Sequence, residues 1–148
     1  MNNVQSAIIT PVLAAGSTTN PYLYSINITQ RLCSPACADN PPVFVPQFAV
    51  TSISSLGSNM YMANVRVQGL ISYVPCGKTS CCAKTQPLSQ TFSIPFVSET
   101  TPSSVEVTIA GPVVNEISVS SCQSCSRTFV SETPLSVNVV TAEAAAGN

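Results

Sequence analysis

Residues 61–96 read YMANVRVQGLISYVPCGKTSCCAKTQPLSQTFSIPF, and this stretch decides the fold class. From Tyr61 to Tyr73, apolar residues or glycine occupy the odd positions, and polar residues occupy most of the even ones. The alternation resumes from Leu88 to Phe96. Period-two alternation over this length is typical of a β-strand with one face buried and one in water. The stretch therefore predicts two long strands joined by a cysteine-containing loop.

The composition extends this prediction to the whole chain. The 148 residues are 45% hydrophobic, with Val, Ile, Thr and Ser abundant and strong helix formers scarce. This length suits one domain that is large enough to bury a core. Residues of these types favour strands. We expect an all-β chain that forms an antiparallel β-sandwich of about seven or eight strands in jelly-roll or meander order.

Other alternating segments lie on both sides of the central pair. They cover residues 6–14, 22–32, 43–53, 105–119 and 128–140. Pro46 predicts an edge position or a bulge in its segment, because proline cannot donate to a strand ladder. Residues 54–59 are expected to form a turn. Gly111–Pro112 divides its segment into a strand pair or one broken strand.

The direction of successive strands predicts where the cysteines gather. Short connections between strands reverse the chain at every turn. Counting reversals from residue 22 places the cysteine loops at residues 33–42, 76–82 and 122–125 at the same end of the molecule. The turns rich in Ser, Thr, Gly and Pro then lie at the other end. One repeat opposes this count: Phe96–Thr100 recurs as Phe129–Thr133, and as a structural repeat it would start the last strand only at Leu135.

The cysteines are the main candidates for chemistry, and three interpretations stay open. The odd count of seven leaves at least one thiol for a bond between subunits if the others form disulfides. Alternatively, Cys33, Cys37, Cys122 and Cys125 bind zinc as a tetrathiolate, although no histidine is present and the spacings differ. In the third interpretation they are inert reduced thiols. The cross-link candidates are Cys33, Cys37, Cys76, Cys81, Cys82, Cys122 and Cys125.

The sequence does not favour an enzyme. Without histidine, a catalytic cysteine lacks its usual base, and Lys78 and Lys84 beside Cys81–Cys82 are more simply solubilising. The six acids are spread along the chain, and nothing in the sequence places two in one pocket. There is no glycine-rich phosphate loop. We expect no cofactor unless the cysteines bind zinc. We therefore expect no catalytic residues.

Charge limits the partners. Only 7% of the residues are charged and the net charge is −1, whereas an ordinary domain is about 25% charged. Weak self-repulsion offers little defence against association, so the expected partners are copies of the same chain. Five Lys and Arg residues cannot neutralise a phosphate track, which argues against nucleic acid. No apolar run is long enough for a membrane span.

The two ends of the chain are expected to differ from the sandwich of residues 21–141. Residues 1–20 have no basic stretch before their apolar segment, so we expect no signal peptide. This segment forms either an ordinary edge strand or an arm that adds to a neighbour's sheet. Its docking candidates are Val4, Ile8, Ile9, Val12 and Leu13. Residues 142–148 are expected to be a disordered tail.

Residues 60–140 resemble the SPOCS-type domain of spore-coat assembly proteins from endospore-forming bacteria. The resemblance rests on VRVQGLISY at 65–73, FSIPF at 92–96, VEVTI at 105–109 and LSVNVV at 135–140. The cysteine loops, the low charge and the first 55 residues depart from that domain. The resemblance implies an antiparallel β domain that assembles on a spore surface, with no catalytic residues.

These expectations together predict a structural protein. The chain would be a self-assembling subunit of a surface layer, fibre or appendage on an endospore, cross-linked through cysteines and strand addition. Besides copies of itself, its expected partners are other coat or capsid proteins. A viral capsid-decoration or fibre protein would share the composition, and its site would be the virion. A zinc-stapled module that binds another protein is the alternative from a different class.

Overall fold

The structure is a computed structural model that describes residues 7–77, 83–120 and 124–141. Within these residues the chain forms strands and no helix, so the all-β prediction is confirmed. The strands are β1 (Ile8–Leu13), β2 (Tyr22–Cys37), β3 (Val43–Phe44), β4 (Gln47–Gly57), β5 (Met60–Tyr73), β6 (Lys84–Val97), β7 (Pro102–Ile109), β8 (Val114–Ile117) and β9 (Cys125–Thr141).

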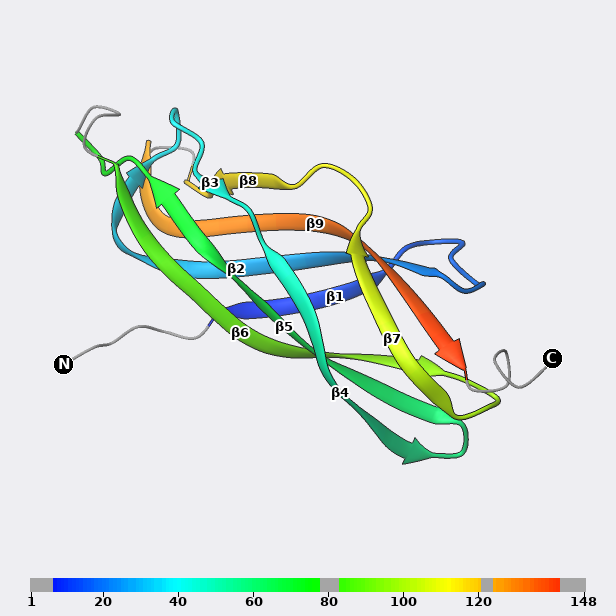
Figure 1. The fold of residues 1–148 in the computed structure, drawn as a ribbon. Coiled ribbons are helices and arrows are strands. Elements are labelled where there is room, and N and C mark those ends of the chain that lie inside the picture. Colours follow the sequence, from blue (N-terminus) through cyan, green and yellow to red (C-terminus); the bar gives the residue numbers. More distant parts are fainter. Residues whose placement is uncertain (1–6, 78–82, 121–123, 142–148) are drawn as a thin grey trace.

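Two antiparallel sheets form the sandwich. Sheet A has the order β1-β2-β9-β7, with β8 also paired to β9, and sheet B consists of β3 to β6 around β5. Strands β4, β5 and β6 therefore form a meander in one sheet, while the first and last hairpins join through β2 and β9 in the other. In Figure 1, β2 and β9 run across the view and β5 and β6 cross it diagonally.

The long strands alternate as the sequence predicts. In β5, Ala63, Val65, Val67 and Ile71 are fully buried, and the residues between them are exposed or half-buried. In β6 the buried positions are the even ones, from Gln86 to Phe96. These residues meet the inner face of sheet A, where the rings of Phe44 and Phe129 pack edge to face with their centroids 5.6 Å apart.

Proline interrupts both broken strands. β3 and β4 both pair with β5, and the break at Val45–Pro46 separates them, as the sequence predicts for Pro46. β7 and β8 pair with successive parts of β9, on either side of Gly111–Pro112. Each pair is thus one strand divided where a proline cannot supply its ladder N–H.

Glycine at position 69 is required by the packing of β3 against β5. A Cβ atom at Gly69 would lie 2.8 Å from Cε1 of Phe44 and 2.8 Å from the carbonyl oxygen of Val45. Carbon atoms do not approach this closely without a shift of the backbone. The break after β3 therefore needs a residue without a side chain in the facing strand.

Two sequence-based boundaries were wrong. The predicted loop at 33–42 starts too early, because β2 continues to Cys37 through a register shift between Arg31 and Ala36. The turn predicted at 54–59 reduces to Ser58 and Asn59, which have φ of 55° and 66° between the paired residues Gly57 and Met60. Two central residues with positive φ are typical of a type I′ hairpin.

The last strand was predicted at residues 128–140, and the structure agrees with that prediction apart from a few residues at its ends. β9 begins at Cys125 and runs without interruption through Phe129–Thr133. Its counterpart Phe96–Thr100 ends β6 and enters a turn in which the Ser98 hydroxyl donates to the Thr100 carbonyl. The sequence repeat is therefore not a structural repeat.

Candidate functional site

The cysteine end of the sandwich is the candidate site. Cys33 and Cys37 lie at the end of β2, Cys76 follows β5, and Cys125 begins β9. Cys37 is the register partner of Cys125, and Cys76 is bonded to Cys125. The predicted clustering is thus confirmed for these positions. Cys81, Cys82 and Cys122 lie outside the described residues.

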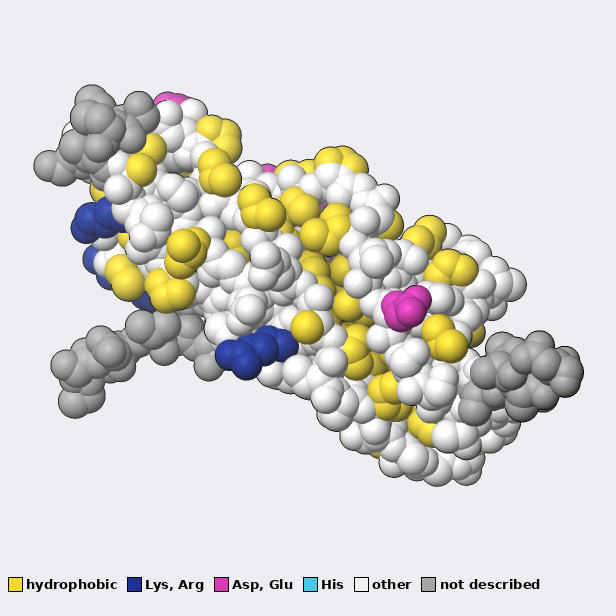
Figure 2. Space-filling model, viewed as in Figure 1, with side chains coloured by type: hydrophobic (Ala, Val, Ile, Leu, Met, Phe, Trp, Pro, Cys, Tyr) yellow, Lys and Arg dark blue, Asp and Glu magenta, His cyan; other side chains and the backbone are white. Residues whose placement is uncertain are grey.

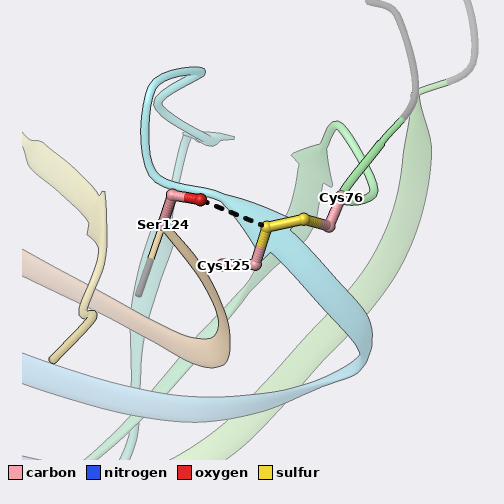
Figure 3. The surroundings of a disulfide bond; sticks show 3 residues. All are labelled: Cys76, Ser124 and Cys125. Carbon is pink, nitrogen blue, oxygen red and sulfur yellow. Dashed lines mark hydrogen bonds between the residues drawn. A yellow bond between two sulfur atoms is a disulfide. The ribbon is translucent and has the colours of Figure 1, made fainter. Parts of the chain in front are cut away.

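A disulfide joins Cys76 to Cys125 across the two sheets, with Cα atoms 6.0 Å apart (Figure 3). It links the segment after β5 of sheet B to the first residue of β9 in sheet A. The Ser124 hydroxyl lies 3.9 Å from the Cys125 sulfur. The covalent bond therefore holds the two layers together at this end.

Two other cysteines are free thiols. Cys33 is exposed and Cys37 is half-buried. Of the predicted zinc ligands Cys33, Cys37, Cys122 and Cys125, the last is already in the disulfide and Cys122 lies outside the described residues. Within residues 7–77, 83–120 and 124–141, no cluster of three or more Cys, Asp or Glu side chains is placed to hold a metal ion.

A buried glutamine positions the end of β2. Oε1 of Gln86 accepts a hydrogen bond from the backbone N–H of Cys33 at 2.8 Å, and its Nε2 donates to the carbonyl of Arg31 at 3.0 Å. These backbone groups belong to the stretch where β2 shifts its register against β9. At the same place, Nζ of Lys84 donates to the Ser34 hydroxyl at 3.2 Å. Sequence reasoning missed Gln86, although a glutamine at an inward position of an alternating strand was the available signal.

The N-terminal docking candidates are divided by the fold. Ile8–Leu13 forms β1, an edge strand of the chain's own sheet A paired with β2. Ile9 is half-buried and packs against the core, whereas Ile8, Val12 and Leu13 are exposed. Val4 lies outside the described residues. Within this chain the segment thus occupies the ordinary edge position.

Two prolines within β6 limit the part of its outer edge that could pair with another strand. Among the described strands, β6 pairs only with β5, and the hydroxyl of Tyr24 in sheet A donates to the Pro95 carbonyl at 3.2 Å. This carbonyl therefore points away from β5, as do the backbone groups of the other odd-numbered residues from 87 to 95. Because Pro87 and Pro95 lack an N–H, the donors on this edge between them belong to Ser89, Thr91 and Ser93.

Apolar side chains group on the outer faces of both sheets. Thirteen large hydrophobic side chains are exposed among the described residues. Val43, Val45 and Leu70 are 60%, 71% and 59% exposed, and with Pro87 they line a hollow of about 540 Å³ on sheet B. We call these four residues the sheet B patch. Figure 2 shows one face of the molecule, where apolar side chains are interspersed among mostly uncharged groups.

A second hollow lies on the outer face of sheet A. It has a volume of about 460 Å³, and its apolar lining includes Leu23, Pro112, Val114 and Pro134. Leu23 and Val114 are 47% and 54% exposed. Both faces of the sandwich therefore present apolar surface to their surroundings.

One pair of carboxylates does share a hollow, which corrects the expectation that nothing brings two acids together. Glu116 of β8 and Glu132 of β9 both line a depression of about 260 Å³ on sheet A. Oε2 of Glu132 accepts a hydrogen bond from the Ser25 hydroxyl at 2.8 Å. The pairing of β8 with β9 brings the two acids together, and this register was not readable from the sequence.

The comparisons with known proteins add no family. No protein-family model matches the chain, and neither the curated proteins nor the solved structures provide a match. Among the residues described, no helix has the length and apolar character needed to cross a membrane. The site must therefore be interpreted from its own geometry.

Proposed function

We propose that this chain is a self-assembling structural subunit of a surface layer, fibre or appendage, and that its main partner is another copy of itself. The observation that carries the proposal is the apolar surface on both outer faces of a chain with only 11 charged residues. Contiguous exposed apolar surface marks interaction sites on soluble proteins. Low charge removes the repulsion that normally keeps copies apart.

The sheet B patch is the proposed contact with a second copy. Complete burial of one Val or Leu side chain contributes about 1.5–3 kcal/mol, so burial of Val43, Val45 and Leu70 would supply a substantial part of an interface. An apolar patch favours an apolar partner surface. The hollow on sheet A of another copy supplies one through Leu23, Pro112 and Val114, with Glu132 also in its lining. Contact between different faces of successive copies generates an open fibre when the rotation between copies does not close a ring.

Two further features support assembly. Cys33 is an exposed free thiol and can form a covalent link between copies. The exposed side chains of β1 and the side of β6 that has no partner among the described strands offer places for strand addition. The prolines at positions 87 and 95 would confine any such pairing on β6 to the segment between them.

The proposed location is the endospore surface, which rests on the resemblance to SPOCS-type domains. Antibodies against the chain are expected to label the outside of intact endospores of the source bacterium. Recovery of the chain with nucleic-acid-filled particles would instead favour a capsid-decoration or fibre protein.

The assembly itself is tested by comparing the wild-type protein with Leu70→Lys. Sedimentation velocity and negative-stain electron microscopy of the oxidised protein are expected to show large regular species that grow with concentration. Leu70→Lys places a charge in the sheet B patch and should return the protein to monomers. The matched control is Ser55→Lys, which adds the same charge at an exposed position of β4, outside the patch and outside sheet A.

Three outcomes would contradict the proposal. The wild-type protein would stay monomeric at all concentrations, or both lysine variants would disperse the assemblies equally, which would indicate a general charge effect. A monomer that releases zinc and unfolds with a chelator would favour the zinc-stapled binding module.

A further inference from the structure

The last residues of β2 lie between two neighbouring segments, and each of these segments carries one cysteine of the disulfide. Ala36 pairs with Ser126 of β9 on one side and with Pro75 on the other. On the second side, the Cys76 N–H donates to the Pro35 carbonyl at 2.9 Å. The disulfide between Cys76 and Cys125 therefore joins the two neighbours of the strand that contains Cys37.

The hydrogen bonds around Cys37 define its pairing with Cys125. The Cys37 N–H donates to the Val74 carbonyl at 3.3 Å, away from β9, whereas the Ala38 N–H donates to the Ser124 carbonyl at 2.9 Å, toward β9. Because backbone groups alternate in direction along an antiparallel strand, Cys37 and Cys125 form a non-hydrogen-bonded pair. In such pairs the Cα atoms are typically about 4.5 Å apart and the side chains lie on the same side.

This geometry suits a second disulfide. Disulfides join residues whose Cα atoms are roughly 4.4–6.8 Å apart, a range that includes the typical distance of a non-hydrogen-bonded pair. Cys37 is a free, half-buried thiol, Cys125 is half-buried and Cys76 is exposed. The sulfur of Cys125 thus has two bonding partners within reach: Cys37 in the middle strand β2, and Cys76 in the segment on the other side of β2.

We propose that Cys37, Cys76 and Cys125 form a thiol–disulfide exchange centre. The Cys37 thiol loses its proton to water, and its thiolate attacks Sγ of Cys125. The Cys37–Cys125 bond forms as the Cys76–Cys125 bond breaks, and Cys76 leaves as a thiolate that takes up a proton. One disulfide and one thiol are present before and after the step, so no oxidant is needed. The result is an exposed thiol at Cys76.

The released Cys76 thiol can react with a second copy of the chain. This part of the proposal rests on the proposed function. The Cys76 thiolate of one copy attacks the Cys76–Cys125 disulfide of another at Sγ of Cys76. A Cys76–Cys76 bond forms between the copies and Cys125 of the second copy leaves as a thiolate. The two copies begin and end with two disulfides and two thiols among these residues, so exchange alone can cross-link them.

Peptide mapping tests the exchange directly. The oxidised protein is incubated without oxidant at about pH 8, near the ordinary thiol pKa, then quenched in acid, alkylated and digested with trypsin. Cleavage after Arg31, Arg66, Lys78, Lys84 and Arg127 separates the cysteines into peptides 32–66, 67–78, 79–84 and 85–127. The starting disulfide links 67–78 to 85–127, and the exchanged disulfide links 32–66 to 85–127 with Cys76 alkylated.

The matched variants are Cys37→Ser and Cys33→Ser. Cys33 lies in the same tryptic peptide, so Cys33→Ser is expected to keep the exchanged linkage, and Cys37→Ser should lose it completely while keeping the starting one. An unchanged unfolding midpoint in each variant shows that the fold is intact. Persistence of the starting linkage alone in the wild-type protein would overturn the proposal, as would loss of the exchanged linkage in Cys33→Ser only.

A mixture of ¹⁴N- and ¹⁵N-labelled protein separates this proposal from the proposed function. A Cys76–Cys76 peptide of mixed isotope in the wild-type protein, absent in Cys37→Ser, supports both. An exchanged linkage without any mixed-isotope peptide or large species leaves the centre in place and counts against self-assembly. Large species in a Cys37→Ser protein without the exchanged linkage would support assembly by contacts independent of the centre.

Discussion

Thr133 is fully buried in β9, and its hydroxyl oxygen has no hydrogen-bond partner among the described residues. A buried polar atom without a partner costs about 1–3 kcal/mol relative to its hydration in the unfolded chain. Nearby, the Ser131 hydroxyl donates to Oδ1 of Asn115 at 2.7 Å. The same strand thus holds one unsatisfied and one satisfied hydroxyl.

Replacement of Thr133 by Val is expected to stabilise the fold. Valine has the same shape and removes the unpaired oxygen, so the free energy of unfolding should rise by about 1 kcal/mol. The measurement is urea denaturation of the oxidised protein. Ser131→Ala is the control and should lower the free energy of unfolding by about 1 kcal/mol, since it leaves Asn115 without its donor. A loss of stability in Thr133→Val would show that its hydroxyl is hydrogen-bonded.

Tyr24 predicts a loss of stability in alkali. Burial, and then the neighbouring Tyr22, raise the pKa of Tyr24 above its ordinary value of 10.0. Above that value the unfolded chain loses the proton before the folded chain does. The unfolded state then binds fewer protons, so stability falls as the pH rises from about 10 toward the folded pKa. Below pH 10 the contribution is fully present.

The variant Tyr24→Phe isolates this effect. Near neutral pH it should lower the free energy of unfolding by about 1 kcal/mol, because the hydrogen bond to the Pro95 carbonyl is lost. Urea denaturation across the alkaline range is then expected to show the difference from wild type shrinking above pH 10. A constant difference would contradict a raised pKa at Tyr24. Both proteins carry the same cysteines, so thiol chemistry affects them equally.

At the scale of elements, β2 deviates from regular pairing where it reaches the cysteine end, and Gln86 of β6 supports it there. The amide of Gln86 bonds the backbone of Cys33 and Arg31 from the opposite sheet. Nε2 of Gln30 also donates to the Arg31 carbonyl, at 3.0 Å. The Arg31 carbonyl therefore keeps its hydrogen bond from Gln30 when Gln86 is replaced, whereas the Cys33 N–H loses the bond to Gln86.

Gln86→Leu is expected to destabilise the cysteine end. The part-buried Cys33 N–H would lose this acceptor, which should lower the free energy of unfolding by about 1 kcal/mol. Gln90→Leu is a matched control, since Gln90 lies on the same face of β6 and is only half-buried. Chemical denaturation of both variants gives the comparison. Equal effects in the two variants would show that the Gln86 amide does not hold β2.

At the scale of the whole molecule, the disulfide joins the two layers through cysteines that lie 49 positions apart in the sequence. In the chain-entropy description, a cross-link that closes a loop of this length stabilises the fold by about 4 kcal/mol, because it restricts the unfolded chain. The apolar core between the sheets supplies stability independently of it. The double variant Cys76→Ser/Cys125→Ser should therefore fold but unfold at a lower urea concentration.

Equilibrium denaturation checks this prediction. The wild-type protein with reductant should approach the midpoint of the double variant, and reductant should leave the double variant itself nearly unchanged. Equal midpoints for oxidised wild type and double variant would mean that the Cys76–Cys125 bond does not contribute to stability. The comparison requires dilute, monomeric protein, since assembly also shifts the unfolding equilibrium.

Much of the fold was predictable because buried and exposed positions of the strands alternate in the same way as apolar and polar residues in the sequence. The alternation in residues 61–73 and 88–96 corresponds to the buried positions of β5 and β6, and the prolines at 46 and 112 mark the broken strands. The ends of strands were harder to predict where side chains from other strands stabilise them. β2 passes Cys33 because Gln86 satisfies its irregular backbone, which no local pattern shows.

The sequence by itself determined the fold class, the alternation of buried and exposed faces and the common end of the cysteine loops. These follow from local periodicity and from the reversal of the chain at each turn. Only the tertiary structure decided that Cys37 pairs with Cys125 while Cys125 bonds Cys76, that Glu116 and Glu132 share a hollow, and that apolar side chains gather on both outer faces. The physical reason is register: a shift of one residue between distant strands changes which side chains meet, and the sequence of either strand alone does not contain it.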